Sequence, residues 1–163
     1  LAGLSMPERG LAHGQAVASV ALRMGEELIR NGARLDLDLV HNAALLHDVA
    51  KGRPGHEAAG GALLDRLGLG GLSPIVGAHR DVPPPASGVL TEKEVVCLAD
   101  KLVRCDRRIR VEERFGGKLA LYADNPEACA AIRGRMQHAL ALRGMVEKAC
   151  GRGLEDILAG VLP

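Results

Sequence analysis

The chain has 163 residues and a formal net charge of +1 at pH 7, a length that suits one domain with its own hydrophobic core. This small net charge argues against a protein whose main partner is nucleic acid or an anionic membrane surface. The chain has one phenylalanine, one tyrosine and no tryptophan, so few aromatic rings are available to stack on bases. No apolar run approaches the ~20 residues of a membrane span.

Ser5 and Pro7 predict the N-terminus of a first helix that runs to about Arg30 with an apolar stripe of helical period. His13 lies in the first half of this helix. A single histidine on a helix is more often a surface or core residue than a metal ligand. Its neighbour Gly14, however, would allow another helix to approach closely.

Residues 41–52, with the sequence HNAALLHDVAKG, form the most informative stretch of the chain. We expect a short buried helix in which His47 and Asp48 both lean toward one point in a cleft, with Lys51 close to the same face. Buried ionisable groups need partners, and a cation suits both an imidazole and a carboxylate. In the alternative interpretation, His47 and Asp48 merely hydrogen-bond to each other in a core helix.

This second helix is expected to begin near Asp36 or Asp38 and to end at Gly52. His41 lies in the same helix, seven residues before Asp48. That spacing puts the two residues about 10 Å apart along the axis, which is too far to share an ion. We therefore interpret His41 as a rim or structural residue.

Two further histidines lie at the ends of predicted helices. His56 opens a helix over residues 57–67, whose glycine pair at 60–61 predicts close packing against the helices that carry the other candidate ligands. His79 ends a short helix over residues 75–79, beside a stiff proline-rich turn. It can either line a cleft or act as a cation that stabilises the helix dipole.

Residues 91–94, Thr-Glu-Lys-Glu, form a capping box that predicts a long helix to about Arg110. Asp100 lies among the apolar residues of this helix and needs a partner. Arg104 and Arg107 follow at four and seven residues and are expected to share its face. Two interpretations remain: an Asp100–Arg104 salt bridge on the helix, or a metal ligand with phosphate-binding arginines behind it.

The remainder of the chain, residues 109–163, is expected to form packing helices: a segment at 119–122, a helix from Asn125-Pro126 to about Cys150, and a last one over 154–162. We assign no role to His138. No segment alternates with the period of a strand. The sequence therefore predicts an all-α fold, a compact bundle of about six to eight helices.

The four cysteines, none in a CxxC pair, predict small buried thiols in a reducing compartment and hence a cytoplasmic protein. The chain starts at Leu1 rather than Met, and its first residues look like the end of a linker. We therefore expect a single domain over residues 1–163 that belongs to a longer chain, with a possible fused partner domain.

Taken in order, the polar residues at buried positions form the pattern H…HD…H…H…D, which resembles the HD superfamily of metal-dependent phosphohydrolases. The local sequences at 45–51, 55–57 and 98–101 are also similar to that family, and the resemblance covers residues 11–108. The Ala-Asp-Lys segment most resembles small bacterial HD proteins that split symmetrical dinucleoside tetraphosphates. One departure is Arg80, where some subfamilies carry a second histidine or a threonine.

The resemblance implies one or two divalent transition-metal ions, and imidazoles with carboxylates suit Fe, Mn, Zn, Co or Ni. One ion is assigned to His13, His47, Asp48 and Asp100; Asp48 would bridge to a second ion held by His56 and His79. A hydroxide between the two ions would attack phosphorus. The expected phosphate-binding residues are Lys51, Arg80, Arg104 and Arg107, with Asp48 and Lys51 as the catalytic pair.

The sequence therefore favours metal-dependent hydrolysis of a phosphoester or phosphoanhydride bond in a small, nucleotide-like substrate. Two alternatives come from other functional classes. One is a regulatory nucleotide-binding module appended to another catalytic domain, and the other is a helical scaffold with incidental histidines. Turnover of a generic phosphoester with added Mn²⁺ would distinguish the enzyme from the regulatory module. Metal analysis of the purified protein would distinguish the enzyme from the helical scaffold.

Overall fold

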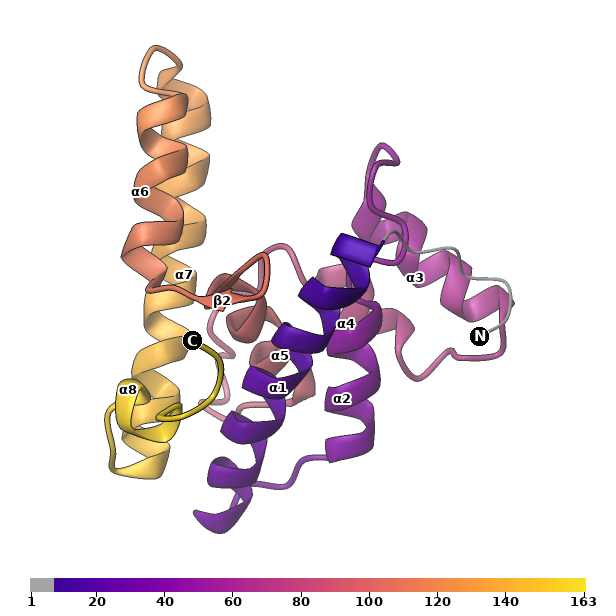
Figure 1. Cartoon of the computed structure of the whole chain (residues 1–163), viewed down its shortest axis with the longest axis vertical. Coiled ribbons are helices and arrows are strands. Elements are labelled where there is room, and N and C mark those ends of the chain that lie inside the picture. Colours follow the sequence, from indigo (N-terminus) through magenta and orange to yellow (C-terminus); the bar gives the residue numbers. More distant parts are fainter. Residues whose placement is uncertain (1–7) are drawn as a thin grey trace.

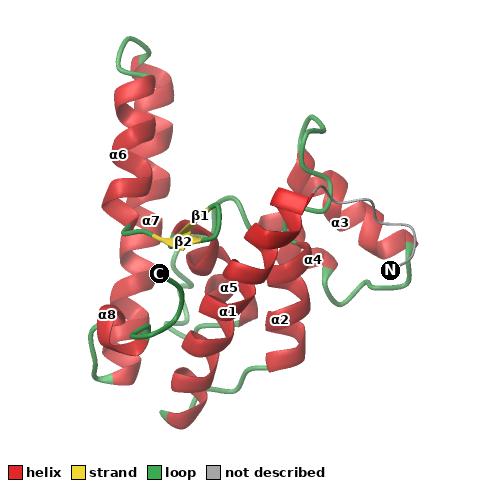
Figure 2. Ribbon diagram, in the orientation of Figure 1, coloured by secondary structure: helices red, strands yellow, loops and turns green. Residues whose placement is uncertain are grey.

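The computed structural model describes residues 8–163, in which helices and one short hairpin account for the regular structure (Figures 1 and 2). The predicted helix start at Ser5 and Pro7 lies outside these residues. The elements are α1 (Glu8–Arg30), α2 (Leu37–Leu46), α3 (His56–Arg66), α4 (Ser73–Ala78), α5 (Glu92–Lys101), β1 (Val103–Arg104), β2 (Arg107–Arg108), α6 (Val111–Leu121), α7 (Pro126–Cys150) and α8 (Leu154–Ile157). The all-α class is confirmed, as is the number of helices expected in the described part of the chain.

The core is aliphatic and forms where α1 packs against α2 and α5 (Figure 1). Val17, Val20, Met24 and Leu28 recur at helical spacing along α1 and are completely or almost completely buried. α5 is buried on nearly all sides, from Glu94 to its last residue. This central position of α5 brings its C-terminal end, and with it the functional residues there, into the middle of the molecule.

Close contact between α1 and α2 depends on Gly14. A Cβ atom at this position would lie 2.5 Å from the backbone oxygen of Leu45, a distance that real Cβ atoms do not reach. His13 on α1 is thereby held beside the end of α2. The predicted packing role of the glycine pair at 60–61 is also confirmed, because a Cβ at Gly60 would lie 3.1 Å from Val76 of α4 and 3.4 Å from Val49.

The second predicted helix ends earlier than expected, at Leu46 rather than at Gly52. From His47 onward the chain coils in turns closed by i→i+3 hydrogen bonds, such as the one from the Val49 amide to the Leu46 carbonyl. The His47 ring donates to the Ala44 carbonyl, an oxygen that a continued α-helix would use itself. His47 and Asp48 therefore lie just past a helix end, where side chains can converge from several directions.

The predicted long helix from residue 92 to Arg110 is also wrong. Its capping box is present, but α5 ends at Lys101 and the chain turns back in the hairpin of β1 and β2, with Cys105 in the left-handed conformation at φ 56°. Residues 104–108 are mostly charged and offer no apolar stripe to bury, whereas the hairpin buries Val103. Asp100 consequently shares no helix face with Arg104 or Arg107.

The helices α6 and α7 form an antiparallel pair whose outer part projects away from the rest of the molecule, while α7 also packs against α1 and α5 (Figure 1). α7 begins as predicted, with the Asn125 side chain accepting from the Ala128 amide, and ends at Cys150, followed by Gly151 in the left-handed conformation. The last predicted helix is shorter than expected and ends at Ile157. Among the helices described, none combines the length and the apolarity needed to cross a membrane.

The Gly14 contact leads to a stability prediction. Gly14→Ala should lower the free energy of unfolding by about 1–3 kcal/mol, because the added methyl group must push α1 away from the backbone of α2. Urea denaturation followed by circular dichroism measures this change. The control is Gly134→Ala in α7, whose Cβ would meet no atom within 4 Å and which should stabilise by roughly 0.5–1 kcal/mol through helix propensity. Equal midpoints for the two variants would contradict the prediction.

Candidate metal centre

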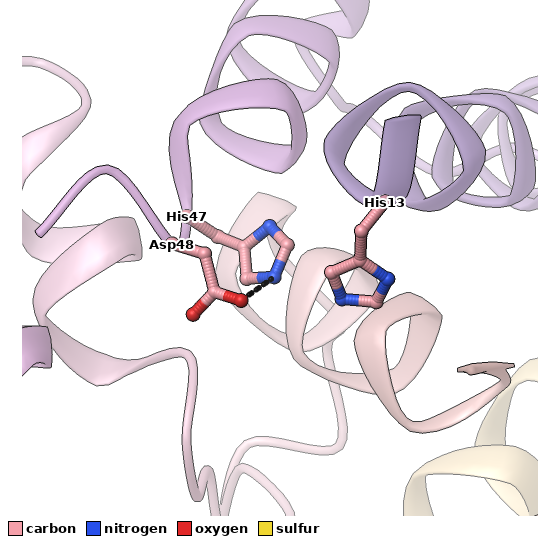
Figure 3. A group of neighbouring side chains, drawn as sticks. All are labelled: His13, His47 and Asp48. Atoms are coloured by element: carbon pink, nitrogen blue, oxygen red, sulfur yellow. Dashed lines mark ion pairs between the residues drawn. The ribbon is translucent and has the colours of Figure 1, made fainter. Parts of the chain in front are cut away.

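His47 and Asp48 occupy the centre of the site (Figure 3). The His47 side chain is 1% exposed, its Nδ1–H donates to the Ala44 carbonyl at 2.7 Å, and its Nε2 atom is buried without any hydrogen-bond partner. The 3.5 Å between this Nε2 and Asp48 Oδ2 is too long for a good hydrogen bond. The two residues therefore do not satisfy each other, which argues against the simple core-helix interpretation.

His13 reaches this centre from α1, and Asp100 reaches it from α5. The His13 Nδ1–H donates to the Cys105 carbonyl at 2.9 Å, and its Nε2 lies 3.3 Å from Asp100 Oδ1. The same oxygen lies 3.6 Å from His47 Nε2. The rings of His13 and His47 meet edge to face with their centroids 5.2 Å apart. A carboxylate oxygen and two ring nitrogens thus face one small volume.

Asp48 also faces a second pair of histidines, which come from α3 and from the end of α4. His79 donates Nδ1–H to the Val76 carbonyl at 2.7 Å, and its Nε2 lies 3.7 Å from Asp48 Oδ1. His56 Nε2 lies 3.5 Å from the same oxygen. Five segments of the fold therefore contribute side chains to one cluster, with Asp48 in the middle.

The hydrogen bonds of three histidines decide which ring nitrogen is available. His13, His47 and His79 each donate Nδ1–H to a backbone carbonyl, so Nε2 is the ring nitrogen that each turns toward the two carboxylates. This is the arrangement of metal-ligating histidines in proteins. A buried Nε2 without a partner is costly unless something accepts its lone pair, and a cation does so.

The spacing of these atoms also fits metal ions. Two groups in the described chain have ligand atoms that all lie within 4.8 Å of one another: His13, His47 and Asp48, and Asp48, His56 and His79. Ligands bound at ~2.1 Å around a transition ion lie about 3.0–3.4 Å apart, so small side-chain adjustments would complete either group. The donor set, imidazole plus carboxylate, suits Fe, Mn, Zn, Co or Ni.

Both carboxylates at the centre stay ionised although they are buried. Burial by itself raises the pKa of Asp48, but the neighbouring His79 and His47 rings and then Lys51 outweigh it, so the pKa lies below its usual range. Burial likewise raises the pKa of Asp100, and the charge of Lys101 is the largest of the effects that hold it well below the ordinary value. The site therefore offers a cation two negative charges.

Cations that the sequence analysis did not assign surround Asp100. Lys101 Nζ donates to Asp100 Oδ2 at 2.7 Å, and Arg114 on α6 lies 3.2 Å from Asp100 Oδ1 while also donating to the Val103 carbonyl. The Ala-Asp-Lys segment already placed Lys101 beside Asp100. No local signal identified Arg114, because its contact depends on the hairpin that returns α6 to the end of α5.

Glu57 is a second residue that the sequence analysis did not assign. It is buried, and its Oε2 lies 3.6 Å from His56 Nδ1 while its Oε1 lies 3.5 Å from Arg80. The Glu57 carboxylate therefore lies on the Nδ1 side of the ring, away from the Nε2 atom that faces Asp48. The signal available in the sequence was an acid directly after His56.

The predicted phosphate-binding residues separate into three groups. Lys51 and Arg80 line the cleft of about 310 Å³ that opens onto Asp48, His56 and His79. Arg104 lines a neighbouring hollow beside His13 and pairs with Glu113 at 4.0 Å, so the Asp100–Arg104 salt bridge is not formed.

Arg107, on the exposed strand β2, is not among the residues that line either hollow. The two histidines left without a role lie outside the cluster. His41 is half-buried in the middle of α2, and His138 pairs with Asp81 at 2.9 Å. The structure therefore brings neither histidine to the cluster.

Comparison with known proteins gives one positive finding. The family model described as the HD domain matches residues 10–105, which is more than half of the chain. No curated protein and no solved structure matches. All six residues of the candidate cluster lie inside the matched range, and α6, α7 and α8 lie outside it.

The shared position of Asp48 leads to a prediction about metal content. Asp48→Ala should lose both ions, because each group of ligand atoms includes this carboxylate, whereas His79→Ala should keep the ion on the His13 side. Elemental analysis of the purified proteins measures the metal content per chain. His41→Ala and His138→Ala are the matched histidine controls and should keep the parental content. A folded Asp48→Ala protein with parental metal content would contradict the bridging role.

Proposed function

The chain belongs to the HD-domain family, a superfamily of metal-dependent phosphohydrolases, and we propose that it cleaves a phosphoester or phosphoanhydride bond in a nucleotide-like substrate. The observation that carries this proposal is the cluster centred on Asp48, with three histidines that turn Nε2 toward the carboxylates and one of them, His47, whose buried Nε2 has no partner. Such a donor set is expensive to bury without a cation. We assign His13, His47, Asp48 and Asp100 to one ion, and Asp48, His56 and His79 to a second.

The residues around this cluster support phosphoryl chemistry. When bound, divalent ions lower the pKa of water and offset negative charge on a phosphoryl group. Lys51 projects from the turn after Asp48, with a 64% exposed side chain whose Nζ donates to Asp48 Oδ2 at 2.5 Å. It is therefore free to move from the carboxylate to an incoming phosphate. Arg80 lies at the same cleft, and its guanidinium group can hold two phosphate oxygens at once.

Within the superfamily, we place the chain with the small bacterial HD proteins that split symmetrical dinucleoside tetraphosphates. The Leu98-Ala99-Asp100-Lys101 segment supports this placement, since Lys101 and Asp100 form a buried ion pair at the centre. We further propose a single domain over residues 1–163 with its HD core at 11–108. All four cysteines are free, which supports a cytoplasmic setting; Cys97, Cys129 and Cys150 are buried as expected, whereas Cys105 in the hairpin is exposed.

The proposal is tested by turnover with added Mn²⁺. The chain should hydrolyse bis(p-nitrophenyl) phosphate or p-nitrophenyl phosphate, and a screen of nucleotides, dinucleoside polyphosphates and cyclic dinucleotides should identify a better substrate. Asp48→Ala should abolish this activity, because both groups of ligand atoms include Asp48. Binding of nucleotides without any turnover would instead favour a regulatory nucleotide-binding module.

Lys51 provides a more specific prediction. Lys51→Ala should lower kcat and kcat/KM together by about 10²-fold, the usual cost of losing one electrostatic stabiliser of the transition state, with metal content unchanged. Steady-state kinetics on the best substrate and elemental analysis measure the two quantities. Arg53→Ala is the control, since Arg53 is an exposed cation two residues away that does not line the cleft. A Lys51→Ala protein with parental kcat would contradict this role.

A further inference from the structure

The cleft at the candidate metal centre has a second wall, which comes from α6 and α7. Arg114, Phe115 and Lys118 of α6 and Arg135 of α7 line it, opposite the residues from α3 and α4. The family match ends at residue 105, so this wall belongs to the part of the chain that lies beyond the matched HD domain. Any substrate that reaches the centre through this cleft passes along these side chains.

The side chains that line the cleft carry more positive than negative charge. Its three carboxylates are all paired with neighbouring cations: Asp48 with Lys51, Glu57 with Arg80, and Asp100 with both Lys101 and Arg114. Two further cations remain. Within residues 8–163, no carboxylate oxygen lies within 4.0 Å of Lys118 Nζ or of the Arg135 guanidinium group.

The surroundings of Lys118 show the consequence of this imbalance. Its side chain is exposed, yet nearby protein partly desolvates the ammonium, which lowers its pKa, and the charges of Arg114 and Lys101 lower it further. Its ammonium lies 5.9 Å from the ring centroid of Phe115, a weak interaction at this distance. Arg114 also keeps a buried Nε–H without a hydrogen-bond partner. Cations that repel one another in this way create a site for an anion.

We propose that Lys118 and Arg135 form an anion subsite that holds a second phosphate group of the substrate while the first lies at the metal centre. The substrate class is therefore a compound with at least two linked phosphates, such as a phosphoanhydride chain, rather than a simple phosphomonoester. The inference rests on the proposed function, since it places the reacting phosphate at the Asp48 cluster. It adds a specificity role for α6 and α7.

Binding measurements test the subsite without any turnover. The ligands are the manganese complexes of orthophosphate and of imidodiphosphate, a diphosphate analogue whose P–N–P bridge resists hydrolysis. Isothermal calorimetry at constant ionic strength on the full chain should show imidodiphosphate binding at least tenfold more tightly than orthophosphate. Lys118→Ala and Arg135→Ala should each weaken imidodiphosphate binding by about five- to tenfold, and orthophosphate binding by clearly less.

Arg133→Ala is the matched control, because Arg133 is an exposed arginine of α7 outside the cleft lining. It should leave both affinities unchanged. Three results would overturn the proposal: parental imidodiphosphate affinity in the two cleft variants, equal losses for both ligands, or no preference for imidodiphosphate in the parent chain. A chain without hydrolytic activity that gives the expected binding pattern would refute the proposed function and leave the subsite intact.

Discussion

The site depends on burying two carboxylates and several imidazoles in one small volume. Water cannot hydrate these groups fully, so each polar atom needs a protein partner or a cation. Hydrogen bonds from Nδ1 to backbone carbonyls satisfy one side of His13, His47 and His79, and the buried Nε2 atom of His47 is left without a partner. The Nε2 atom of His47 and the Asp48 carboxylate therefore face a position that a cation would fill.

This requirement also explains how the surrounding fold is arranged. The ligand atoms come from α1, the turn after α2, α3, the end of α4 and α5, so a bound ion would connect segments far apart in the sequence. An ion that binds only the folded state adds its binding free energy to stability. The close contact at Gly14 holds His13 in place before any ion binds, which reduces the ordering that binding would require.

The positive side chains of the cleft serve two different purposes. Lys101 and Arg114 are committed to Asp100, which they keep ionised and orient, and Lys51 and Arg80 each have one carboxylate partner at the cleft. Lys118 and Arg135 have no such partner among the described residues, so they remain available to a substrate. Under the proposed function, the HD core would supply the reacting centre, and the helices beyond it would supply charge that selects among phosphorylated substrates.

The sequence by itself determined the helical class, the capping box at Thr91 and the span of α7, because caps leave local patterns. The six residues of the candidate cluster came out of the sequence only as a set, through the resemblance to the HD superfamily, since local reasoning left other interpretations open for His13, His79 and Asp100. It did not determine that α2 ends at Leu46 or that a hairpin follows α5. Only the tertiary structure decided these ends, together with the contact of Arg114 with Asp100 and the meeting of His13 with Asp100 across 87 residues. Local periodicity records which face of a helix is buried, whereas the partner of a buried charge is set by segments distant in the chain.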